Sequence, residues 1–152
     1  MKKAAYLLVA LAIVLFDQIT KHIARDSIGP FEIKKILPFL QLVSVRNEGA
    51  AFGLFAALGN TTFILISVVA IIVVLVLLMR TGEDRFGLAL VLGGAIGNLI
   101  DRIVFGKVTD FIDVFAGRFH WPAFNVADSS LTVGLVVLLF HSFFPGKREN
   151  PL

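Results

Sequence analysis

Four long apolar segments constrain the fold of this chain more than any other feature of its sequence. A helix needs about 20 mostly apolar residues to cross a bilayer, and each segment comes close to that length. The second carries only Ser67 as a polar side chain, whereas the first continues past Asp17 and Lys21. We therefore expect four transmembrane helices. The segments are residues 4–24, 63–79, 86–105 and 129–144.

The composition agrees with an integral membrane protein and excludes several classes of function. Hydrophobic residues make up 57% of the 152 residues, against about 45–50% in a soluble domain. Cysteine is absent, which excludes disulfides and thiol chemistry. The net charge of +3 is too small to indicate a nucleic-acid-binding protein. We expect one membrane-embedded domain over residues 1–152 and no cofactor.

Four spans place both termini on one side of the membrane. Six of the fourteen Lys and Arg residues fall on that side, in three short segments, and eight are spread over the other side. The raw count does not decide the orientation, but the rule that basic residues stay inside weights short loops. We expect both termini in the cytoplasm. The six residues are Lys2, Lys3, Arg80, Arg85, Lys147 and Arg148.

Two connectors then lie on the outer side. In the first, residues 26–60, the stretch 33–45 is rich in β-branched residues and predicts short strands, and 49–58 predicts a short surface helix. The second, residues 106–127, holds Trp121, a candidate interface anchor.

Two groups of polar residues occupy single helix faces. Asp17 and Lys21 are four residues apart and can pair. Asn98, Asp101 and Arg102 share a face one turn beyond a Gly93 and Gly97 pair that favours close helix packing. Each polar group is either an internal salt bridge that makes insertion tolerable or support for a reaction centre, and spacing alone leaves both open.

Asp110 and Asp128 stand beside the outer ends of two spans, where two carboxylates can meet for acid–base chemistry. A carboxylate near hydrocarbon is costly, by roughly 2.5–3.5 kcal/mol at mid-bilayer, and therefore suggests a function. Asp128 could instead be a helix N-cap, a role that Asn125 could also serve, and Asp113 is a rival partner for Asp110. The histidines at 22, 120 and 141 have no metal-site spacing, and no hydrolase or phosphate-loop motif is present.

Five sequence blocks, in order along nearly the whole chain, resemble the bacterial lipoprotein signal peptidase (signal peptidase II) family. Each block alone is weak, but five in order between four spans are specific. They are DQITK at 17–21, NEGAAFG at 47–53, GNLIDR at 97–102, VTDF at 108–111 and FNVAD at 124–128.

The resemblance implies an aspartic endopeptidase of the bacterial inner membrane with its active site near the outer face. It would remove signal peptides from diacylglyceryl-modified prolipoproteins, cutting before the lipidated cysteine, and globomycin would inhibit it. Asp110 and Asp128 would be the catalytic pair. The first outer connector would form a small sheet and a surface helix that hold the substrate. We expect a monomer that needs no metal. The supporting residues implied are Asp17, Lys21, Asn47, Gly49, Asn98, Asp101, Arg102 and Asn125.

Two other functions remain open from the residues alone. A small proton-coupled transporter or channel subunit also uses intramembrane Asp, Arg and Lys, although here the charges gather at one end of the spans. A non-enzymatic assembly subunit would use Gly93 and Gly97 but leaves the two aspartates unexplained. For a peptidase, we expect the apolar stretch around Phe52, Leu54 and Phe55 to form a flap over a site open to lipid.

Overall fold

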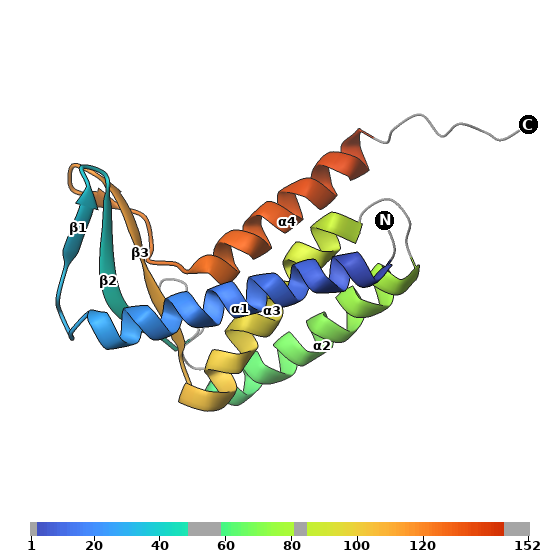
Figure 1. The fold of residues 1–152 in the computed structure, drawn as a ribbon, viewed down its shortest axis with the longest axis horizontal. Coiled ribbons are helices and arrows are strands. Elements are labelled where there is room, and N and C mark those ends of the chain that lie inside the picture. Colours follow the sequence, from blue (N-terminus) through green and yellow to red (C-terminus); the bar gives the residue numbers. More distant parts are fainter. Residues whose placement is uncertain (1–2, 49–58, 81–84, 145–152) are drawn as a thin grey trace, which may run out of the picture.

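The computed structural model describes residues 3–48, 59–80 and 85–144 (Figure 1). It contains four helices that are long and apolar enough to cross a membrane, which confirms the four expected spans. At 1.5 Å per residue, even the 18-residue α4 extends about 27 Å, close to the thickness of a hydrocarbon core. The helices are α1 (Lys3–Ser27), α2 (Gly59–Arg80), α3 (Arg85–Phe105) and α4 (Val126–Phe143).

Helix α4 begins three residues earlier than its apolar run suggests. Its N-cap is Asn125, whose side-chain oxygen accepts a 2.8 Å hydrogen bond from the backbone N–H of Asp128. Asp128 is therefore in the first turn, and the interpretation of this residue as the helix cap is wrong. An asparagine cap satisfies a backbone donor that would otherwise lack a partner, so the carboxylate of Asp128 is left for other contacts.

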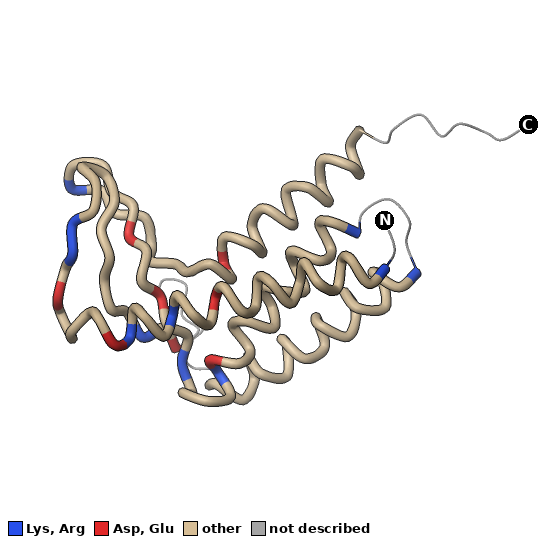
Figure 2. Tube along the Cα trace, viewed as in Figure 1, with Lys and Arg blue, Asp and Glu red and all other residues tan. Residues whose placement is uncertain are grey.

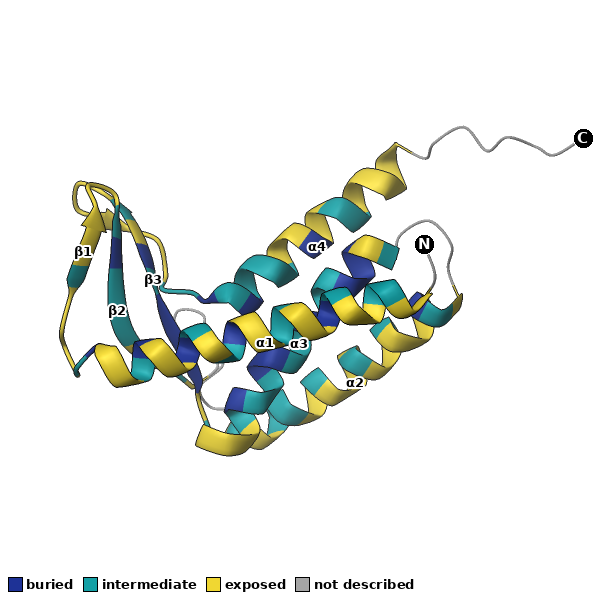
Figure 3. Ribbon diagram, viewed as in Figure 1, coloured by how far each residue is buried: buried dark blue, intermediate teal, exposed yellow. Residues whose placement is uncertain are grey.

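Helix α3 is the central element of the bundle and contacts the other three helices. Its buried face shows as dark blue in Figure 3. A Cβ atom at Gly93 would lie 2.8 Å from the backbone oxygen of Ala10 in α1, and one at Gly97 would lie 2.6 Å from Asp17 Oδ2. The two glycines thus let α1 lie directly against α3, as their spacing predicts.

The outer surfaces of the helices are apolar. Helix α2 buries only Leu78, and its other side chains are partly or fully exposed (Figure 3). In water such a surface would be unfavourable, whereas in a bilayer hydrocarbon chains cover it. The exposed faces therefore fit four helices embedded in lipid.

A four-stranded antiparallel sheet lies at one end of the bundle, in the order β1-β2-β3-β4 (Figure 1). The first connector supplies β1 (Lys34–Leu37) and β2 (Leu40–Asn47), which confirms the expected strands. The second supplies β3 (Val108–Ala116) and β4 (Phe119–His120). The sheet therefore takes strands from both connectors, and the pairing of β3 with β2 places Asp110 opposite Val45.

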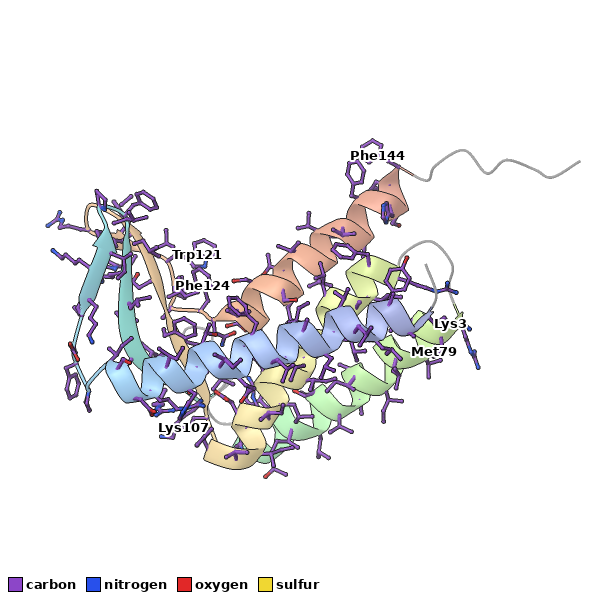
Figure 4. The ribbon with its side chains drawn as sticks, viewed as in Figure 1. Lys3, Met79, Lys107, Trp121, Phe124 and Phe144 are labelled. Carbon is purple, nitrogen blue, oxygen red and sulfur yellow. The ribbon has the colours of Figure 1, made fainter. Side chains whose placement is uncertain are left out.

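The two ends of the molecule differ in charge. Lys3, Met79 and Phe144 lie at the end away from the sheet (Figure 4), as an even number of spans requires. Most described charges gather at the sheet end, whereas a few basic positions, at the start of α1, the end of α2 and the start of α3, mark the opposite end (Figure 2). The expected surface helix at 49–58, with the flap residues Phe52, Leu54 and Phe55, lies outside the described residues.

Candidate active site

Asp110 is held on β3 where the sheet meets the bundle. Its side chain is buried, with 1% of its surface exposed. Oδ1 accepts a 2.6 Å hydrogen bond from Asn125 Nδ2, and Oδ2 accepts one of 2.9 Å from Asn47 Nδ2. Burial raises the pKa of Asp110 to about 6, and the nearby negative charge of Asp128 adds to this against the opposing hydrogen bond from Asn47.

Asp128 approaches the same place from the first turn of α4. Its Oδ1 accepts a 2.7 Å hydrogen bond from Asn98 Nδ2. Asn125 Nδ2 in turn lies 3.3 Å from Asn98 Oδ1 while it donates to Asp110. Two asparagines therefore join the two carboxylates, of which Asp128 comes from the bundle and Asp110 from the sheet.

A buried ion pair on α1 contacts the residues that hold Asp128. Lys21 Nζ lies 2.8 Å from Asp17 Oδ2, and both side chains are fully buried. Lys21 also donates a 2.9 Å hydrogen bond to Asn98 Oδ1, and Asp17 Oδ1 accepts one of 2.9 Å from the backbone N–H of Ala127. The predicted pair therefore does more than neutralise charge, because it connects α1 to Asn98 and to the first turn of α4.

Asp101 connects α3 to the sheet. Its Oδ2 accepts a 2.8 Å hydrogen bond from the backbone N–H of Thr109, the residue before Asp110. Its Oδ1 lies 3.4 Å from Arg25 Nη1. Asp101 thus fixes the start of β3, and with it the position of Asp110.

Arg102 is less closely engaged than Asn98. Its guanidinium lies 5.4 Å from the centre of the Phe63 ring, and Nη1 is 3.5 Å from the backbone oxygen of Asn98. Among the described residues, no ion pair joins Arg102 to a carboxylate. Of the two expected supporting residues Asn98 and Arg102, Asn98 is the one that donates a hydrogen bond to Asp128 among the described contacts.

Asp113, the rival partner, is engaged elsewhere. It lies three residues beyond Asp110 on β3, and an odd spacing in a strand places side chains on opposite faces. Its Oδ2 accepts a 2.7 Å hydrogen bond from Gln41 Nε2 and lies 2.9 Å from His120 Nδ1. Asp113 therefore contacts the neighbouring strands rather than the network of Asn98 and Asn125.

The structure adds residues that spacing did not single out. Gln18 donates to the backbone oxygen of Gly97 at 3.0 Å and contacts Asp17 at 3.1 Å. Arg25 and Arg46 both donate to the hydroxyl of Thr109. Gln18 follows Asp17 and Thr109 precedes Asp110 in the sequence blocks that resemble the family. Their position next to candidate residues could have predicted a place in the site.

Asp110 also faces a cavity. The cavity has a volume of about 370 Å³ and is open to the surroundings. Gly49, an expected site residue beside this region, lies outside the described residues. The cavity is lined by Val45, Arg46, Asn47, Glu48, Asp110, Pro122 and Ala123.

Comparison with known proteins places this arrangement in a family. The family model described as signal peptidase (SPase) II matches residues 9–144. The chain belongs to the signal peptidase II family. That membership supports removal of signal peptides from lipoproteins and gives no support to the transporter alternative.

Individual relatives agree with this family over most of the chain. The lipoprotein signal peptidase of Thermodesulfovibrio yellowstonii is 44% identical over 128 residues, covering 84% of this chain and 87% of that protein. The one from Burkholderia thailandensis is 42% identical over 143 residues, covering 90% and 86%. A bacterial membrane enzyme solved by the in meso method at 2.3 Å superposes with a TM-score of 0.87 at 31% identity, covering 98% of this chain and 94% of that one. The fold of that bacterial membrane enzyme thus extends over most of this chain.

Proposed function

We propose that this signal peptidase II is an aspartic endopeptidase, formed as one domain, that uses Asp110 and Asp128 as its catalytic dyad. The observation that carries the proposal is a pair of carboxylates, Asp110 buried and Asp128 half-buried, joined through Asn98 and Asn125. Withdrawing acidic groups from water is costly, and hydrogen bonds from two asparagine amides offset part of that cost. Such a pair suits hydrolysis, which needs a base for water and an acid for the carbonyl oxygen.

The hydrogen bonds favour different roles for the two carboxylates. Both oxygens of Asp110 accept amide hydrogen bonds, which stabilise its ionised form. Asp128 accepts one side-chain hydrogen bond, on Oδ1, among the described contacts. We assign Asp110 as the general base and Asp128 as the general acid that carries the shared proton.

The reaction then proceeds in two steps. In the first, a water molecule gives a proton to Asp110 and its oxygen bonds to the scissile carbonyl carbon, while Asp128 gives its proton to the carbonyl oxygen. In the second, the carbon–nitrogen bond breaks, Asp110 returns its proton to the leaving nitrogen, and one hydroxyl returns a proton to Asp128. The dyad ends in its starting protonation state, and its two titrations belong to the pair.

The position of the dyad suits a lipid-linked substrate. It lies at the sheet end of helices whose outer faces are apolar (Figure 3), so a peptide anchored by acyl chains reaches it without leaving the bilayer, where each buried CH₂ contributes roughly 0.8 kcal/mol. We propose a diacylglyceryl-modified prolipoprotein as substrate, cut before its lipidated cysteine. Lys3, Arg80 and Arg85 at the far end favour cytoplasmic termini in a bacterial inner membrane. A monomer would suffice, and globomycin would inhibit this site.

The test is cleavage of a diacylglyceryl-modified prolipoprotein, followed by gel shift, with Asp110→Asn, Asp128→Asn and Asp113→Asn. Asparagine preserves the side-chain shape, so the change removes acid–base capacity. We expect the first two variants to lose at least about 10²-fold in rate and the Asp113 variant to keep most of its activity. Normal cleavage by a folded Asp110 or Asp128 variant would remove that residue from the mechanism.

A further inference from the structure

Two arginines that the peptidase mechanism does not use converge on one hydroxyl group. Arg25 Nη1, from the last turns of α1, lies 3.2 Å from Thr109 Oγ1, and Arg46 Nη1, from β2, lies 2.8 Å from the same atom. The two guanidiniums are therefore within a few ångströms of one another. Like charges this close repel, and an anion bound between them would relieve the repulsion.

The nearby acidic groups do not balance these charges. The carboxylate next to Arg25 is Asp101, at 3.4 Å, and Asp101 also lies 3.8 Å from Lys21. In the part of the chain that the structure describes, no carboxylate lies within ion-pair distance of Arg46. Arg46 is exposed and lines two open cavities, of about 370 and 560 Å³, so an incoming anion can reach it.

The surroundings match the boundary between lipid chains and headgroups. The guanidinium of Arg25 lies 4.4 Å from the centre of the Phe105 ring at the end of α3. On the bundle side, the apolar side chains of Ile23, Ile103 and Val104 are exposed. On the sheet side lies Lys107, labelled in Figure 4 at the same end of α3, where it forms a 2.6 Å ion pair with Glu48. Cations directly beyond an exposed apolar surface lie where lipid phosphates do.

We propose that Arg25 and Arg46 form a binding site for the phosphate of an anionic phospholipid headgroup, with the acyl chains on the apolar ends of α1 and α3. Arginine suits this role because its planar guanidinium binds phosphate through two parallel hydrogen bonds. A diacylglyceryl group carries no phosphate, so the proposed ligand differs from the lipid of the substrate, although Arg46 also lines the cavity that Asp110 faces. The phosphate contacts do not depend on the assignment of the dyad.

The experiment measures lipid affinity of the full-length protein in neutral detergent, by titration and by native mass spectrometry. The probes are phosphatidylglycerol, phosphatidylcholine and inorganic phosphate. We expect phosphatidylglycerol to bind at least tenfold more tightly than phosphatidylcholine. Arg25→Gln with Arg46→Gln should weaken phosphatidylglycerol binding about 30-fold, and Arg46→Gln alone about fivefold.

Two further double variants distinguish a specific phosphate site from a general attraction between the lipid and positive charge. Lys34→Gln with Lys35→Gln removes the same charge from β1 at the same end of the molecule, and should weaken binding less than threefold. Arg25→Lys with Arg46→Lys keeps the charge but removes the guanidinium fork, and should still weaken binding several-fold.

The proposal fails if the arginine and lysine pairs lose affinity equally, since the attraction would then be diffuse. It also fails if the two lipids bind equally well to the wild type. Displacement of phosphatidylglycerol by millimolar inorganic phosphate would assign the site to a free anion instead. If the double arginine variant does not fold, the single variant Arg46→Gln tests the proposal, because an exposed side chain can be replaced without disturbing the fold. Unchanged phosphatidylglycerol affinity in that variant would then overturn the proposal.

Discussion

The side-chain amide of Asn98 donates a 2.7 Å hydrogen bond to Oδ1 of Asp128. The other end of the same amide accepts a hydrogen bond from the buried ammonium of Lys21 at 2.9 Å. Asn98 thus links the buried ammonium of Lys21 to the carboxylate of Asp128 in the first turn of α4. Because an amide has one donating and one accepting end, the Lys21 contact determines which end faces Asp128.

Replacing Asn98 by alanine should therefore weaken catalysis. Asp128 becomes ionised when it gives its proton to the carbonyl oxygen, and a hydrogen bond to a charged group contributes about 1.5–3 kcal/mol, so we expect kcat to fall about 10- to 100-fold with a smaller change in KM. Steady-state cleavage of a lipidated substrate measures both. Asn60→Ala, which removes a hydrogen bond to the backbone of Arg102, is the control and should change kcat less than threefold. Full kcat in the Asn98 variant would contradict the orienting role.

The buried pair of Asp17 and Lys21 should show strong coupling in a double-mutant cycle. Lys21→Met alone leaves a buried carboxylate uncompensated and should cost about 3–5 kcal/mol. Asp17→Asn with Lys21→Met should cost clearly less than the sum of the single changes. Thermal unfolding in detergent measures the effects. The exposed pair of His22 and Asp26 is the control, with coupling below about 1 kcal/mol. Additive effects at Asp17 and Lys21 would exclude direct coupling.

Gly97→Ala should disturb the site through Asp17. The new Cβ would lie 2.6 Å from Asp17 Oδ2 and 3.3 Å from the Cβ of Ala127, so α1 or α4 must move. We expect a loss of about 1–3 kcal/mol in the free energy of unfolding and a fall in kcat. Val104→Ala, at a position 63% exposed on the same helix, should change neither by a comparable amount. An unchanged unfolding temperature in the glycine variant would show that the helices are less tightly packed than described.

The raised pKa of Asp110, about 6, predicts two pH dependences. As the general base, Asp110 must be ionised, so kcat/KM should fall as pH decreases through about 6. The folded state binds this proton more tightly than the unfolded state, so the contribution to stability is present below pH 3.8 and is lost as pH rises to about 6. The lost contribution is on the order of 3 kcal/mol.

Asp110→Asn tests the stability effect, since asparagine does not titrate. The difference in unfolding temperature between the variant and the wild type should shift in favour of the variant as pH rises from 4 to 7, and remain level above pH 7. Asp26→Asn, at an exposed position, is the control and should show no such shift. Parallel curves for the wild type and the Asp110 variant would mean that Asp110 does not titrate in this window.

Several features could be predicted because they depend on local sequence. The spans follow from runs of apolar residues, since a bilayer selects for length and hydropathy. The pairing of Asp17 with Lys21 follows from helix periodicity. The role of Gly97 in helix packing follows from the absence of a side chain, which allows a neighbouring helix to come close. The resemblance to the family, rather than spacing, selected Asp110 and Asp128 as partners.

Other features depended on contacts between distant segments. The strand β3 was not predicted, because its pairing with β2 joins two connectors that lie about 60 residues apart in the chain. That pairing turns Asp113 towards Gln41 and Asp110 towards Asn47 and Asn125. It also brings Arg46 to the hydroxyl group of Thr109, to which Arg25 donates as well.

The sequence by itself thus determined the membrane class, the four spans and the residue types available for chemistry, because hydropathy and periodicity act over neighbouring residues. Tertiary structure decided that asparagines link Asp110 to Asp128, and that Asn125 rather than Asp128 caps α4. The physical reason is that hydrogen bonds and burial between distant segments depend on register and helix packing, which no local pattern contains.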